Sequence, residues 1–136
     1  MTHLSKDKIM GDRVFLILLV LTVLITKHMV FDFCLQSLQQ IRNKRIYGHP
    51  SGLIHAAGHA AGTCLAFLVI TPSLVVATAI VLTEFVVHYH IDWLKEEIGH
   101  RLKLPPDRKI FWVAFGIDQW LHQLTYVGIA LILALS

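Results

Sequence analysis

The sequence has little charge for its length. Of its 136 residues, 12 are Lys or Arg and 9 are Asp or Glu, so charged side chains make up only 15% of the chain, against 55% that are hydrophobic. A soluble helical domain needs polar outward faces on its helices, and several long segments here have almost none. The composition therefore predicts a membrane protein.

The chain also has few cysteines. Cys34 and Cys64 are the two that the sequence contains, and both fall inside long apolar segments, where we expect small buried residues. This excludes a disulfide-stapled scaffold. The first apolar run resembles the core of a signal peptide, but Lys27, His28 and Phe31 follow it where small residues would precede a cleavage site, so we expect an uncleaved first span.

Several motifs of common enzyme classes are missing as well. The sequence has no glycine-rich phosphate-binding loop, no G-x-S-x-G nucleophile motif and no H-E-x-x-H zinc-protease motif. Its basic residues occur in short clusters rather than in a continuous patch, which favours lipid headgroups over nucleic acid as contacts. We therefore expect membrane lipids as partners and no nucleic acid.

The apolar segments are long enough for four membrane-spanning helices, since a helix crosses the hydrocarbon in about 20 residues. The expected helices cover residues 12–41, 51–70, 72–102 and 107–135. We predict an all-α integral membrane fold, with four transmembrane helices in one antiparallel up-down bundle that forms a single domain over residues 1–136. Basic residues concentrate at 42–50 and 95–109, which predicts cytoplasmic loops there and both termini outside.

Each expected helix carries one pair of ionisable residues at i and i+4. This spacing places both side chains on one helix face, and the alternating chain direction brings all four pairs to the cytoplasmic end. Ionisable groups in a bilayer cost several kcal/mol each unless they pair, face water or bind an ion. The candidate metal ligands are His28, Asp32, His55, His59, His88, Asp92, Asp118 and His122.

This mixture of imidazole and carboxylate groups suits one or two divalent metal ions. Zinc fits best, and iron or manganese also fits. Glu84 lies one turn before His88 and is our candidate general base, or an additional ligand. We expect Gln36, Gln119 and Gln123 to hydrogen-bond to ligands or substrate, and Lys95 to hold an anionic headgroup.

Small residues surround the histidines of the second expected helix. Ala56 and Ala60, and likewise Gly58 and Gly62, repeat at a spacing of four. This pattern lets helix backbones approach closely, which short Asp and His side chains need if they are to meet around one ion.

Four blocks, "HMVFDFCLQ", "GLIHAAGHA", "HYHIDWLK" and "IDQWLHQL", resemble the conserved blocks of the bacterial and phage integral-membrane family called domain of unknown function 3307. The resemblance extends from the first block to the last. It implies a small membrane protein of the bacterial inner membrane, or one encoded by a phage, and it implies no activity. The residues that match the family pattern are His28, Asp32, Phe33, Gln36, His55, His88, Asp92, Lys95, Asp118, Gln119 and His122.

Three classes of function remain open from the sequence. The first is a metal-dependent hydrolase that acts on a lipid or lipid-linked substrate from the cytoplasmic leaflet, with a redox iron enzyme as a variant. The second is an ion or metal transporter, which would need a homo-oligomer because four spans are few. The third is a non-catalytic membrane adaptor in which the His/Asp cluster only fixes helix packing.

Overall fold

The computed structural model describes the backbone of residues 3–136 and the side chains from residue 8 onward. Within this part of the chain every regular element is helical, which confirms the all-α prediction. The elements are α1 (His3–Met29), the π-helix η1 (Val30–Leu35), α2 (Leu38–Asn43), α3 (Pro50–Thr63), the 3-10 helix η2 (Cys64–Leu68), α4 (Leu74–Arg101) and α5 (Lys109–Leu135).

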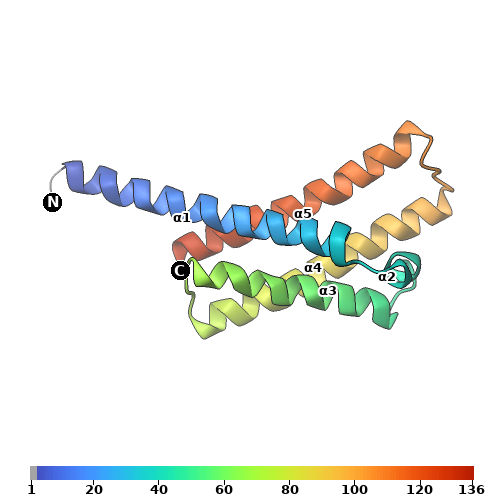
Figure 1. The fold of residues 1–136 in the computed structure, drawn as a ribbon, viewed down its shortest axis with the longest axis horizontal. Coiled ribbons are helices and arrows are strands. Elements are labelled where there is room, and N and C mark those ends of the chain that lie inside the picture. The colour runs from blue at the N-terminus through green and yellow to red at the C-terminus, as the bar shows by residue number, and fades with distance from the viewer. Residues whose placement is uncertain (1–2) are drawn as a thin grey trace.

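The four longer helices run alternately in opposite directions (Figure 1). Helix α3 packs against α1 and α4, and α5 packs against α1 and α4. The C-terminus and the turn between α3 and α4 lie at one end, while α2 and the turn between α4 and α5 lie at the other, and α1 projects beyond its neighbours (Figure 1). We call the end that contains α2 the basic end, because both basic loops lie there.

The structure interrupts the first expected helix, 12–41. Helix α1 begins earlier, at His3, and the π-helix that continues it ends at Leu35. Gln36 is extended, and Ser37 caps the separate helix α2 in a capping box with Gln40. The S-x-x-Q spacing is the sequence signal for this start, and the local hydrogen bonds that it provides favour a new helix over continuation of the old one.

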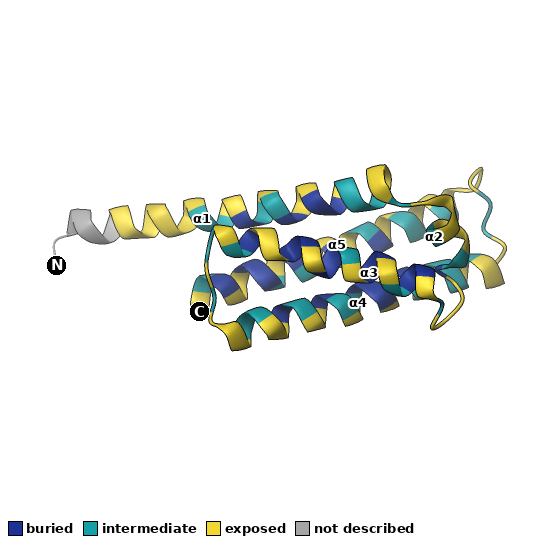
Figure 2. Cartoon of the chain, turned by 60° about the horizontal axis from the view of Figure 1, so that its bottom comes forward, coloured by how far each residue is buried: buried dark blue, intermediate teal, exposed yellow. Residues whose placement is uncertain are grey.

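An apolar core fills the end of the bundle away from α2. It includes Val20 and Leu24 of α1, Ile80 of α4 and Leu133 of α5, all at most 3% exposed. Figure 2 shows buried residues on the faces that the helices turn toward one another. This core aligns the helices and thereby sets the separation of the polar side chains nearer the basic end.

The outward faces of the bundle are rich in large apolar side chains. Phe15 and Leu18 of α1, Leu82 of α4 and Leu131 of α5 are each more than half exposed. The two cysteines are exposed too, so the expectation that they are buried is wrong. They lie on the outward faces because the inward positions of their helical segments are taken by other residues.

Two of the helical segments in the described chain, Lys8–Leu35 and Leu74–Arg101, are long and apolar enough to cross a membrane. The other two expected spans do not meet this measure within the described residues. Helix α3 has only 14 residues before its geometry changes to 3-10, and α5 carries Asp118, Gln119, His122 and Gln123 in its middle.

Candidate metal centre

Five histidine rings from α1, α3, α4 and α5 form one buried cluster. Each ring belongs to a residue that is at most 4% exposed. Neighbouring ring centroids lie between 3.8 and 5.8 Å apart. The members are His28, His55, His59, His88 and His122. The histidines of the predicted i, i+4 pairs therefore lie together in the interior of the bundle.

Asp32 organises one side of this histidine cluster. Its Oδ1 lies 3.0 Å from Nε2 of His55 and 3.0 Å from Nε2 of His59, and its Oδ2 lies 3.2 Å from Nε2 of His28. Asp32 is in the π-helix, a distortion that often occurs at functional sites. Ligand atoms of Asp32, His55, His59 and His88 lie within 4.8 Å of one another and can hold a metal ion.

Asp92 organises the other side. Its Oδ2 lies 3.4 Å from Nε2 of His88 and 3.3 Å from Nε2 of His55, and its Oδ1 lies 3.9 Å from Nε2 of His122. Ligand atoms of His88, Asp92 and His122 form a second group that can hold a metal ion. His88 belongs to both groups, so the two groups adjoin one another through its ring.

Several buried ring nitrogens in the cluster have no hydrogen-bond partner among the described residues. They are Nδ1 of His59, Nδ1 and Nε2 of His88, and Nε2 of His122. Nδ1 of His122 lies 2.9 Å from the backbone oxygen of Asp118. A carbonyl oxygen only accepts, so Nδ1 donates and Nε2 of the neutral ring carries a free lone pair. Such a nitrogen is costly when buried unpartnered and well suited to bind a metal.

His28 differs from the other four histidines. Its Nδ1 lies 2.9 Å from the hydroxyl of Tyr126, and its Nε2 lies near Asp32 and 3.2 Å from Oε1 of Gln119. Both nitrogens have partners, and His28 is in neither of the two metal-binding groups. In this arrangement it orients the Asp32 carboxylate.

Glu84 is also engaged by other residues. Lys27 forms a buried ion pair with Glu84, and the hydroxyl of Thr63 donates to the other carboxylate oxygen. Lys27 also donates to the backbone oxygen of His59 at 2.9 Å. The three side chains join α1, α3 and α4 directly beside the histidine cluster. Both oxygens of Glu84 are thus occupied, and the residue is in neither metal-binding group.

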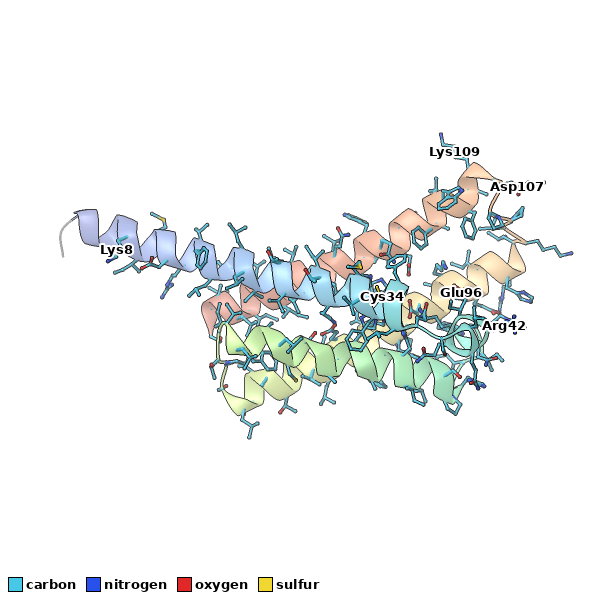
Figure 3. All side chains as sticks on the ribbon, viewed as in Figure 1. Lys8, Cys34, Arg42, Glu96, Asp107 and Lys109 are labelled. Atoms are coloured by element: carbon cyan, nitrogen blue, oxygen red, sulfur yellow. The ribbon has the colours of Figure 1, made fainter. Side chains whose placement is uncertain are left out.

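A cavity of about 210 Å³ adjoins the cluster on the side of the basic end. Asp32, Asp92 and Asp118 line it together with Lys44 and Lys95. Figure 3 shows that Arg42, Glu96 and Lys109 lie toward this same end, whereas Lys8 lies at the other. The cavity gives the buried carboxylates a route to the polar surroundings.

Comparison with protein families tests the resemblance noted from the sequence blocks. The model of the family described as "Protein of unknown function (DUF3307)" matches residues 20–136, which include every residue of the cluster. The chain belongs to the DUF3307 family. This confirms the resemblance. No curated protein and no solved structure matches this DUF3307 chain.

Of the remaining predicted site residues of the DUF3307 chain, three lie beside the cluster or its cavity and one does not. Gln36 lies 3.2 Å from the ring of His55, and Gln119 bridges His28 and Asp118, so both lie next to the cluster as expected. Lys95 lines the cavity. Gln123 is exposed, because it follows His122 by one residue on α5 and so points away from the face that carries Asp118 and His122.

Sequence reasoning missed four residues of this DUF3307 site. Lys44 lies 2.8 Å from Oδ2 of Asp92, and Lys27 and Thr63 hold Glu84. The ring of Tyr126 lies 4.8 Å from Nζ of Lys27. The sequence does contain a signal for Lys27, because a charged residue inside an apolar run is a functional candidate by default. Lys44 had none, because its basic loop resembles an ordinary topology signal.

Proposed function

We propose that this DUF3307 protein is a membrane-embedded, metal-dependent hydrolase acting on a lipid or lipid-linked substrate that reaches the site from the cytoplasmic leaflet. The observation that carries the proposal is the pair of metal-binding groups that share His88 beside an accessible polar cavity. Purely structural hydrogen bonding would leave fewer buried ring nitrogens unpartnered than the described residues contain.

The distribution of apolar side chains supports the membrane part of the proposal. The ionisable residues of the cluster are buried, while large apolar residues such as Phe15, Leu82 and Leu131 face outward. In water this arrangement would expose an unusually large apolar surface, whereas in lipid it satisfies both kinds of side chain. Both basic loops lie at the end nearest the cavity, and under the positive-inside rule this supports a cytoplasmic position for the cavity.

The two metal-binding groups suggest how the ligands would be distributed between two cations. Asp32, His55 and His59 would hold one cation, and Asp92 and His122 would hold a second. His88 would complete one of these groups as a neutral ring, or would join both after loss of its remaining ring proton. A bound divalent cation supplies Lewis-acid chemistry, polarising a substrate oxygen and making water more acidic. Zinc suits the donor set, and manganese or iron would also be accepted.

A general base must accept a proton from the attacking water, and Asp118 is better placed than Glu84 for this role. Oδ1 of Asp118 has no hydrogen-bond partner among the described residues, and Asp118 lines the cavity. Glu84 has both oxygens occupied by Lys27 and Thr63. We therefore propose Asp118 as the general base and Glu84 as a residue that positions α1, α3 and α4.

Metal content of the detergent-purified protein tests the proposal. We expect one or two equivalents of a divalent metal in the wild type. Asp92→Ala and His122→Ala should each lose the metal of the group that contains them, and neither should hydrolyse a fluorogenic lipid ester or phosphate. His90→Ala is the matched control, because His90 is exposed on the same helix and contacts Tyr47 rather than the cluster.

Other outcomes would overturn the proposal. A metal-free protein whose thermal stability is unchanged by a chelator would show a structural His/Asp cluster, as in an adaptor. Metal binding without hydrolysis, combined with zinc flux into liposomes that Asp92→Ala abolishes, would show a transporter. A metal content equal to that of the wild type in both Asp92→Ala and His122→Ala would show that these two residues are not metal ligands.

A further inference from the structure

We propose that the cavity beside the metal centre binds a phosphate group, so that the substrate is a phosphate ester. This inference rests on the proposed function and narrows its substrate class. The cavity holds two ammonium groups, Lys44 and Lys95, next to the carboxylates of the metal-binding residues Asp32 and Asp92. Such a juxtaposition of cations and metal ligands is typical of sites for phosphoryl groups.

The charge of the cavity discriminates between substrate classes. Its lining contains four carboxylates, of Asp32, Asp92, Asp118 and Glu96, against two lysines. Without metal the excess is negative and would repel an anion. Two bound divalent cations would reverse the sign and leave an excess of two positive charges. This excess matches a phosphate monoester, whereas a neutral carboxylic ester would leave it uncompensated.

Lys95 is the residue most free to contact the phosphate. Its Nζ lies 2.6 Å from Glu96, and both side chains are about a quarter exposed, at 24% and 29%. Solvent-exposed ion pairs contribute little to stability, so an incoming phosphate can replace Glu96 as the partner of Lys95. Lys44 is buried and lies 2.8 Å from Asp92, which ties its charge to a metal ligand.

Asp118 completes the arrangement from the opposite helix. Gln119 donates to its Oδ2 at 3.1 Å, while Oδ1 is unpartnered among the described residues and Asp118 itself is only 5% exposed. A buried carboxylate oxygen without a donor is costly. A small rotation of the Asp118 side chain would open Oδ1 to the cavity, where a water molecule between Oδ1 and the phosphate would satisfy it and would be placed for attack.

The reaction that follows is hydrolysis of a phosphate monoester. The water oxygen forms a bond to phosphorus, and the bond between phosphorus and the ester oxygen breaks. One water proton passes to Oδ1 of Asp118 and from there to the leaving oxygen. The products are an alcohol and inorganic phosphate, and no oxidant, reductant or further reactant is needed.

Phosphate binding to metal-loaded protein tests the inference separately from the proposed function. We expect inorganic phosphate, titrated calorimetrically, to bind the zinc-loaded protein and not the chelator-treated one. Lys95→Gln should weaken phosphate binding about tenfold and leave the metal content unchanged. Lys103→Gln is the matched control, because Lys103 is exposed in the same basic region and does not line the cavity.

A second set of binding measurements distinguishes a phosphate group that belongs to a lipid from one that belongs to a soluble ester. If the substrate is a lipid phosphate, phosphatidic acid in detergent micelles should bind more tightly than inorganic phosphate. Diacylglycerol in the same detergent micelles, which lacks the phosphate, should not bind. Tighter binding of inorganic phosphate than of phosphatidic acid would support a soluble phosphate ester instead.

Two results would overturn the phosphate inference. The inference is wrong if metal-loaded wild type binds no phosphate, or if metal-loaded Lys95→Gln binds phosphate as tightly as the wild type does. Either result would still be compatible with a metal-dependent hydrolase. Absence of metal from the wild type would sink the proposed function as well, and the metal analysis distinguishes this case.

Discussion

The rings of His59 and His88 are stacked, with centroids 3.8 Å apart and planes inclined by 27°. They come from α3 and α4, and they are fully or almost fully buried, at 0% and 1% exposure. The stack brings Asp32 and Asp92 to the same cluster, because each carboxylate contacts one of the two rings. It is therefore the structural link between the two metal-binding groups.

Substitution of the shared ligand should affect both metal-binding groups. We expect His88→Ala to abolish metal binding altogether, since each group would lose a donor, while His122→Ala should remove at most one of two equivalents. Elemental analysis of purified protein measures this directly. Retention of two equivalents by His88→Ala would contradict the assignment of His88 to both groups.

The buried pair of Lys27 and Glu84 should be strongly coupled. Removal of one partner of a buried ion pair costs about 3–5 kcal/mol, because the other charge is left uncompensated. We therefore expect Glu84→Gln and Lys27→Met each to destabilise by about that amount, and the double variant to cost less than the sum of the two. Denaturant unfolding in detergent, analysed as a double-mutant cycle, measures the coupling.

Gly58 should tolerate a side chain less well than Gly116. A Cβ on Gly58 would lie 3.0 Å from the ring of Phe31, whereas a Cβ on Gly116 would meet nothing within 4 Å among the described residues. Both glycines are helical, so alanine gains about the same helix propensity at each, about 1 kcal/mol. We expect Gly116→Ala to stabilise the protein and Gly58→Ala to be less stable than Gly116→Ala by about 1 kcal/mol or more.

The same unfolding measurement tests this pair of glycine variants. Equal stabilities would show that the Phe31 ring shifts without cost. The close packing of α3 against η1 would then not depend on the absence of a side chain at Gly58.

Metal should stabilise the folded protein by an amount that grows with the logarithm of the free metal concentration. A ligand that binds only the folded state adds about 2.7 kcal/mol when present at 100 times its Kd. We expect zinc to raise the Tm of chelator-treated wild type, and Asp32→Asn to reduce that rise, because Asp32 is the carboxylate of one group. A Tm that zinc does not change in the wild type would contradict a metal centre.

The sequence by itself determined the helical fold and most members of the cluster. A long apolar segment in lipid can satisfy its backbone groups within the segment itself only as a helix. The i, i+4 spacing of pairs such as His88 and Asp92 then places both side chains on one face, because a helix turns once in 3.6 residues. These are local properties of the chain, and they can be derived without knowing which helices are neighbours.

Only the tertiary structure decided which atoms meet. Spacing along one helix does not show that Lys27 takes up Glu84, that Tyr126 and Gln119 satisfy His28, or that Lys44 reaches Asp92. Each of these contacts joins residues far apart in the chain, and its distance depends on how the apolar core sets the relative height and rotation of the helices. That packing is a collective property of all four helices, so no single segment encodes it.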